Sequence, residues 1–114
     1  MSPKNMKLLR GTLDFLILQA LSGGQSHGYG VVEWIRETTD GTLEVEDGAL
    51  YTALHRMEKR GLLRASWGTS ENNRRARYYD ITPAGRRELT SAAEDWERYA
   101  EAVFKVLRAG SRPT

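Results

Sequence analysis

Hydrophobic residues recur at helical spacing in several segments of the first half of the chain. Residues 8–22, "LLRGTLDFLILQALS", are apolar around more than one side of the helix they predict, so we expect that helix to be buried on more than one side. Residues 27–39, "HGYGVVEWIRETT", predict a second helix with Val31, Val32 and Ile35 on its inner face. We expect Ser26 to cap this helix, because a hydroxyl there accepts a hydrogen bond from a free backbone N–H.

A third helix is predicted at residues 48–59, between a capping Asp47 and a terminating Gly61. At 100° per residue, Leu50 and Met57 fall on the same side and predict a buried face. The opposite side carries polar and basic side chains, with an aromatic residue at the boundary: Thr52, His55, Arg56 and Lys59, and Tyr51.

Two β-prone runs, "LLRASW" and "ARYYDIT", flank the polar stretch "GTSENNRR" and predict a hairpin over residues 62–82. Pro83 then begins a long helix that runs to residue 109. Hydrophobic residues recur in this helix at alternating steps of three and four, the seam of a coiled coil. We expect that seam to be a dimer interface formed by Leu89, Ala92, Trp96, Tyr99, Val103 and Val106.

Three helices, a hairpin and a long helix in this order predict a mainly α protein with a small β-hairpin, the winged helix-turn-helix. In that fold the third helix enters the DNA major groove, and the hairpin lies on the neighbouring backbone. We therefore expect residues 1–82 to form a DNA-binding domain and residues 83–109 a C-terminal dimerisation helix. Residues 110–114 are expected to be a flexible tail.

Composition argues against several other classes of protein. The chain has 114 residues, the length of one domain, and no cysteine for a disulfide, a thiolate metal site or a thiol nucleophile. We see no signal peptide and no apolar segment long enough to span a bilayer, so we expect a cytoplasmic protein without a membrane partner. His27 and His55 have no companion ligands at metal-binding spacing, and no catalytic constellation is visible. We expect no metal, no cofactor and no enzymatic activity.

The distribution of charge is more informative than the net charge of +2. Residues 1–55 carry four Lys/Arg and seven Asp/Glu, whereas residues 56–79 carry seven Lys/Arg and two Asp/Glu. Residues 80–114 carry six of each. A basic block inside a nearly neutral protein indicates a localised positive surface, as a nucleic-acid-binding face requires.

Four stretches in this order resemble the PadR family of transcriptional regulators, over residues 8–109. They are "GTLDFLILQAL", "HGYGVVEWI", "GALYTALHRMEKRGLL" and "WGTSENNRRARYYDITPAGRREL". The single C-terminal helix with its short tail resembles the compact subgroup of that family. The chain departs from the family at Ala49, where Ser or Thr is common, and at Thr52, where Pro is frequent. A DNA contact through a hydroxyl at position 49 is therefore not transferred to this chain.

We expect DNA to be bound by the outward face of helix 48–59 and by the hairpin. Thr52 retains a hydroxyl that suits a base edge, and arginines near the hairpin tip suit phosphates or the minor groove. Tyr51 equally suits a boundary core position, and His27 and Tyr29 suit either a backbone contact or packing. The expected DNA-binding residues are Tyr51, Thr52, His55, Arg56, Lys59, Arg74, Arg75 and Arg77.

Trp96 is much bulkier than the alanines beside it in the seam. A large side chain next to small ones can leave a gap in the interface that aromatic rings line. The resemblance implies that some family members bind flat, apolar effectors at the dimer interface near this helix. We therefore expect a small aromatic effector to bind at Trp96. Phe15 would line the site if the first helix packs against the partner's last helix, as the resemblance implies. The alternative for Trp96 is an ordinary coiled-coil position.

Together these features predict a homodimeric, sequence-specific regulator that binds a pseudo-palindromic operator in double-stranded DNA. We expect it to repress a nearby promoter until an effector relieves the repression. The alternative is a helical dimer that acts as a protein–protein interaction module, meeting an acidic partner through its basic face. Binding to DNA at low salt discriminates between the two.

Overall fold

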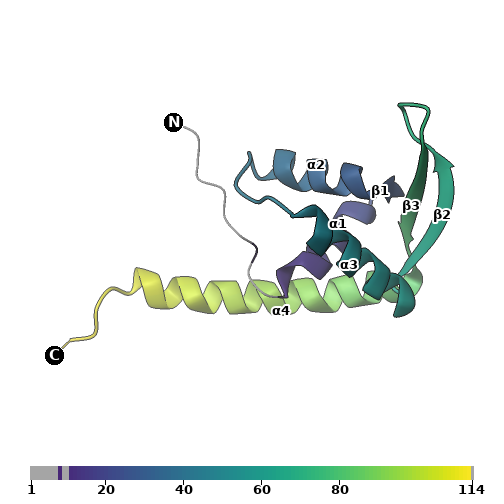
Figure 1. Ribbon diagram of the computed structural model, residues 1–114. Helices are drawn as coiled ribbons and strands as arrows, with labels where there is room; N and C mark the ends of the chain where they lie inside the picture. Colours follow the sequence, from purple (N-terminus) through teal and green to yellow (C-terminus); the bar gives the residue numbers. More distant parts are fainter. Residues whose placement is uncertain (1–7, 9–10, 114) are drawn as a thin grey trace.

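Four helices and three strands make up the computed structural model, which describes residue 8 and residues 11–113 (Figure 1). The predicted mainly α fold with a hairpin and a long C-terminal helix is confirmed. In chain order the elements are α1 (Thr12–Leu21), β1 (Ser26–His27), α2 (Gly28–Thr38), α3 (Asp47–Lys59), β2 (Leu63–Thr69), β3 (Arg75–Ile81) and α4 (Pro83–Arg108).

The core lies where α1, α2 and α3 meet. Ile17, Leu18 and Leu21 of α1 have no exposed surface, which fits a helix covered on more than one side. Val31 and Ile35 of α2 are buried as the spacing predicted. The predicted apolar face of α3 is also buried, and it contributes Leu50, Ala53, Leu54 and Met57.

The predicted start of α1 is partly tested. Residue 8 lies outside the helix, residues 9 and 10 lie outside the described residues, and α1 begins at Thr12. At α2 the predicted cap was wrong, because His27 rather than Ser26 is the N-cap and its imidazole Nδ1 accepts from the N–H of Gly30. Ser26 instead pairs in β1, where its hydroxyl donates to a carbonyl.

The third helix begins one residue earlier than predicted. Asp47 is its first residue rather than its cap, and Glu46 occupies the cap position without a side-chain hydrogen bond. At the other end Gly61 has a φ of +77°, as the predicted stop requires. The N–H of Gly61 donates to the carbonyl of Glu58, and the N–H of Leu62 donates to that of Met57, which satisfies carbonyls that the helix leaves free.

The predicted hairpin is part of a three-stranded antiparallel sheet in the order β1-β3-β2. Tyr79 and Ile81 share the buried face of β3. The sequence pattern missed β1, which pairs Ser26 with Tyr79 and His27 with Tyr78. This short strand ties the start of α2 to the base of the hairpin.

The last helix, α4, is anchored to the hairpin at one end and projects from the domain at the other (Figure 1). Thr82 caps α4 by accepting from the N–H of Gly85, and Pro83 occupies the first turn as predicted. The first half of α4 packs against α1, whereas almost all of its residues from 97 onward are exposed. The longest dimension of the molecule is 63 Å.

Gly85 provides a direct test of this anchorage. A Cβ at this position would collide with the carbonyl oxygen of Leu62 and lie 2.8 Å from Cγ1 of Ile81. We expect Gly85→Ala to lower the free energy of unfolding by about 1–3 kcal/mol, because the backbone at Leu62 must shift to accommodate the added methyl group. Thermal denaturation at fixed protein concentration measures the change.

Gly48→Ala is the matched control, because a Cβ on this residue of α3 would meet nothing within 4 Å. We expect it to leave stability unchanged or to raise it by about 0.5–1 kcal/mol through the lower helix propensity of glycine. Equal stability of both alanine variants would contradict the tight contact at Gly85.

Candidate nucleic-acid interface

The outward face of α3 carries exposed polar side chains, as predicted. Thr52, His55 and Lys59 are all exposed, while the residues between them on the inner face are buried. Ala49 is also exposed on this helix, so its methyl group stands on the surface where the family commonly places a hydroxyl. A helix with one face fixed in the core and the other in solvent presents its polar groups in a defined direction.

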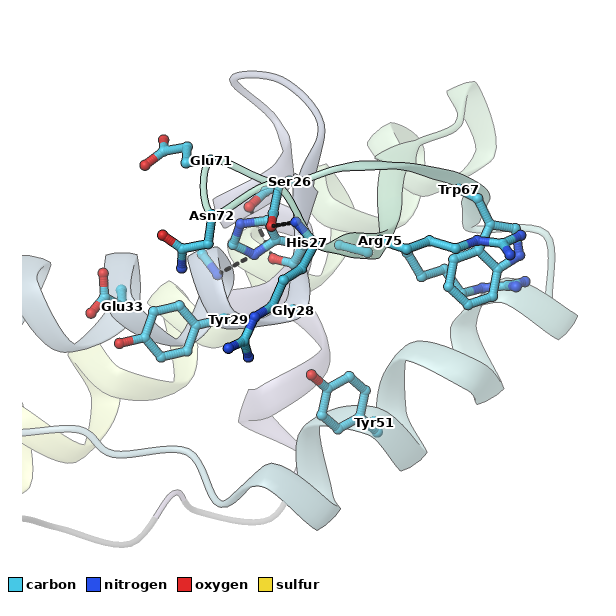
Figure 2. A pocket seen from close by; sticks show the side chains of 15 residues that line it. Ser26, His27, Gly28, Tyr29, Glu33, Tyr51, Trp67, Glu71, Asn72 and Arg75 are labelled. Atoms are coloured by element: carbon cyan, nitrogen blue, oxygen red, sulfur yellow. Dashed lines mark hydrogen bonds between the residues drawn. The ribbon is translucent and has the colours of Figure 1, made fainter.

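Tyr51 combines the two roles that the sequence left open. Its side chain is 54% exposed, yet an added Cβ at Gly28 would lie 3.2 Å from Cε1 of its ring and 3.3 Å from its hydroxyl. Glycine at position 28 therefore makes room for the phenol beside the first turn of α2. In Figure 2 the Tyr51 hydroxyl points from α3 toward the start of α2 and Tyr29.

Two of the predicted DNA-binding arginines form ion pairs within the chain. Arg56 of α3 pairs with Asp14 of α1, and Arg77 of β3 donates to Oε2 of Glu58 at 2.9 Å. The Arg77–Glu58 pair links the hairpin to α3. Both arginines remain more than one-third exposed, and exposed pairs of this kind contribute only about 0–1 kcal/mol. Their guanidinium groups therefore stay available to a phosphate at small cost.

We call β2, β3 and the loop 70–74 between them the wing. Its tip is closed by two backbone hydrogen bonds, from Ser70 N–H to the Arg74 carbonyl at 2.8 Å and from Asn73 N–H to the Ser70 carbonyl at 2.9 Å. Asn73 has a φ of +59°, a conformation that asparagine tolerates better than most residues. Arg74 and Arg75 are exposed at and beside this tip.

The start of α2 forms a second edge of the site. Because His27 Nδ1 accepts the Gly30 N–H at 3.0 Å, the neutral ring carries its proton on Nε2. The ring also contacts Tyr78 edge-on at 5.5 Å between centroids, so His27 has a structural role. Tyr29 is 62% exposed, and its ring stacks on that of His27 at 6.4 Å between centroids. A hydrogen bond with Glu33, together with the charge of that carboxylate, raises the pKa of Tyr29.

An open groove of about 710 Å³ joins these parts (Figure 2). It lies between the first turn of α2, Tyr51 at the start of α3, and the wing. Its lining includes the phenols of Tyr29 and Tyr51, the guanidinium groups of Arg74, Arg75 and Arg77, and the carboxylates of Glu33 and Glu71. Neutral and cationic hydrogen-bond donors around an open groove suit the oxygens of a phosphate backbone.

Sequence reasoning missed Trp67, which lies on β2 opposite Arg77 and lines the same groove. Its side chain is 56% exposed, and the Cζ atom of Arg75 lies 4.4 Å from the centroid of its ring. The signal was present in the sequence, since Trp67 alternates with Ala65 and Leu63 on the hairpin face that also carries the arginines.

The predicted dimer-interface residues fall into two groups along α4. Leu89, Ala92 and Trp96 are half-buried, and Leu89 packs on the core of its own chain. The ring of Trp96 lies 5.8 Å from that of Phe15 on α1 and 5.8 Å from that of Tyr99. Further along α4 a broad apolar surface is exposed, made by Tyr99, Val103, Phe104, Val106 and Leu107.

The part of the chain that the structure describes has neither a metal-binding cluster nor a helix able to span a membrane. There, no cluster of three or more His, Cys, Asp or Glu side chains is arranged to hold a metal ion. None of the helices there combines the length and the apolar character that crossing a membrane demands.

Three helices, a wing with exposed arginines and a polar outward face on the third helix define a winged helix-turn-helix protein. The family model described as "Transcriptional regulator PadR-like family" matches residues 17–91. The chain therefore belongs to the PadR-like family of transcriptional regulators, which act by binding DNA and are not enzymes.

Solved structures of bacterial regulators share the fold over almost their whole length. A transcriptional regulator from Clostridium thermocellum is 35% identical, with a TM-score of 0.76 over 84% of this chain and 93% of that one. A PadR-like transcriptional regulator from Bacillus cereus is 26% identical, with a TM-score of 0.75 over 90% and 97%. A PadR family transcription regulator from Clostridium difficile is 26% identical, with a TM-score of 0.73 over 85% and 99%.

Proposed function

We propose that this chain is a homodimeric, sequence-specific repressor that binds a pseudo-palindromic operator near the promoter it controls. The observation that supports this most is the pairing of two surfaces on one domain. The exposed face of α3 and the groove beside the wing form a donor-rich surface, and the second half of α4 leaves a broad apolar surface uncovered.

The first surface supports a docking geometry on DNA. Thr52 and His55 on α3 would meet base edges in the major groove, where hydroxyl and imidazole groups can hydrogen-bond. Arg74 and Arg75 on the wing would meet phosphates of the adjacent backbone, and Tyr29 would add a phenol donor from α2. Base contacts then determine the sequence read, while phosphate contacts set position and affinity.

The second surface supports a homodimer. Val106 is 73% exposed and Leu107 is 69% exposed in the single chain, although both are fully apolar. Contiguous exposed apolar surface of this kind marks an interaction site. A second copy of α4 offers the complementary heptad seam, and two-fold symmetry of the dimer would match a pseudo-palindromic operator.

A small dimer that covers promoter DNA acts most simply by excluding polymerase, which makes repression the expected outcome. An effector that binds one dimer geometry better than another would change the spacing of the two α3 helices. The half-buried Trp96 supports a site for a planar aromatic molecule, since its contacts with Phe15 and Tyr99 already form an aromatic cluster beside the exposed apolar surface. If no effector binds there, the cluster has only a packing role.

DNA affinity should depend steeply on salt concentration. If each subunit neutralises about four phosphates, the logarithm of the affinity falls with the logarithm of salt concentration with a slope of about −7. Arg74→Ala with Arg75→Ala removes four of these contacts per dimer and should bring the slope to about −4. Fluorescence anisotropy with a duplex from upstream of the protein's own gene measures both slopes.

Arg87→Ala with Arg98→Ala is the control for DNA affinity, because it removes the same charge from exposed positions on α4. It should leave the slope nearly unchanged. Absence of wild-type binding at low salt would contradict the proposed function and favour a protein–protein interaction module.

The chain should assemble as a homodimer in solution. Wild-type protein should have the mass of two chains at micromolar concentration in sedimentation equilibrium. Val103→Asp with Val106→Asp should give single chains, because two carboxylates per helix would be buried unpaired in the interface. Lys105→Asp, which places a carboxylate on the polar side of the same turn, should remain dimeric. A monomeric wild type would contradict the proposal.

An effector that binds at Trp96 should stabilise the protein. In a thermal-shift screen of planar aromatic compounds, at least one should raise the melting temperature, since saturation at about 100 times Kd adds about 2.7 kcal/mol. Trp96→Ala should remove the shift, and Trp34→Ala should retain it because Trp34 lies on α2. No shift with any compound would count against an effector site of this chemistry.

A further inference from the structure

The wing carries a tryptophan, Trp67, that the docking geometry above does not use. We call Trp67, Arg75 and Arg77 the wing stack. Trp67 and Arg77 are direct cross-strand partners, and Arg75 lies two residues along on the same face of β3. The Cζ atoms of Arg75 and Arg77 lie 4.4 Å and 5.5 Å from the centroid of the Trp67 ring, within the range of a cation–π interaction.

One end of the wing stack is fixed to the recognition helix. Arg77 donates to Glu58 of α3 at 2.9 Å, and Glu58 lies on the same helix as the residues expected in the major groove. A continuous series of contacts therefore runs from α3 through Arg77 and Trp67 to Arg75. The position of Arg75 is thereby related to that of α3 by side-chain contacts in addition to the strand backbone.

At the other end of the wing stack, the guanidinium group of Arg75 is available to bind an anion. Among the described residues Arg75 forms no ion pair with a carboxylate, and it is exposed beside the groove. A free arginine side chain samples many rotamers, and ordering it on a phosphate opposes binding. Stacking the planar guanidinium on an indole restricts those rotamers before DNA arrives, while its N–H edges remain available to an acceptor.

We propose that Trp67 is a positioning residue for DNA binding, which holds the Arg75 guanidinium ready for a backbone phosphate. This inference rests on the proposed function, and it adds a residue whose aromatic face, rather than its charge, determines affinity. It also accounts for a 56% exposed tryptophan on a hairpin that projects from the domain.

Three substitutions at position 67 test whether binding depends on the aromatic ring of Trp67 or only on the size of its side chain. Affinity for a random-sequence 30-base-pair duplex at low salt is the readout, measured by fluorescence anisotropy. We expect Trp67→Ala and Trp67→Leu to weaken binding by about five- to tenfold, the range of an exposed to partly desolvated cation–π contact. Trp67→Phe keeps a ring under the guanidinium and should stay within about twofold of wild type.

A double-mutant cycle with Arg75→Ala tests whether Trp67 acts through that arginine. If it does, Trp67→Ala should weaken binding by less than about twofold in the Arg75→Ala background, because the positioned group is already absent. The salt slope of Trp67→Ala should also become shallower by about 2, one phosphate contact for each subunit of a dimer. If Trp67 only stabilised the wing, Trp67→Ala would weaken binding in the Arg75→Ala background as much as it does in the wild type.

Folding is checked on the same samples by circular dichroism melts, which compare Trp67→Leu with Trp67→Phe. Binding of Trp67→Ala and Trp67→Leu at wild-type strength would overturn the positioning role, as would additive losses in the double variant. Failure of the wild type itself to bind the duplex would instead overturn the proposed function. The two failures are therefore distinguishable.

Discussion

One junction connects the parts of this protein on which its function depends. The Thr82 hydroxyl donates to the carbonyl of Gly61 at 2.7 Å and accepts from the N–H of Gly85, while the Thr82 N–H donates to the carbonyl of Leu62 at 3.1 Å. Gly61 and Leu62 end α3 and lead into the wing, and Gly85 lies in the first turn of α4. The third helix, the wing and the long helix therefore meet at a few backbone groups, so closely that a Cβ at position 85 would collide with the carbonyl oxygen of Leu62.

This junction gives α4 two different halves. The half near Gly85 belongs to the domain, since Leu89 packs on the core and Trp96 contacts Phe15 of α1. The half beyond it is exposed and apolar, and it is the surface we propose for the second chain. A helix that is fixed at one end and bound to a partner at the other would convert a change in dimer geometry into a movement of α3. The Phe15–Trp96 contact lies between these halves, where a bound effector would have the greatest influence.

The sequence predicted the helices, the wing and the buried faces well, because each depends on local periodicity or on a residue such as Gly61 or Pro83 at a turn. It missed features that depend on distant pairing. The strand at Ser26 and His27 is too short to carry a pattern and exists because β3 lies beside it. The ion pairs of Arg56 and Arg77 and the stacking on Trp67 likewise join residues from different elements. In each case the residue types were visible, and only the fold brought them together.

The proposed binding of DNA by a dimer requires that the paired α4 helices hold the two α3 helices about one turn of DNA apart. Because the chain has no cysteine, Arg60→Cys at the exposed end of α3 allows one spin label per chain, and double electron–electron resonance then measures the distance across the dimer. With duplex DNA bound, we expect a single distribution within about 10 Å of the 34 Å helical repeat. No dipolar coupling, or a distance beyond about 60 Å, would contradict the account.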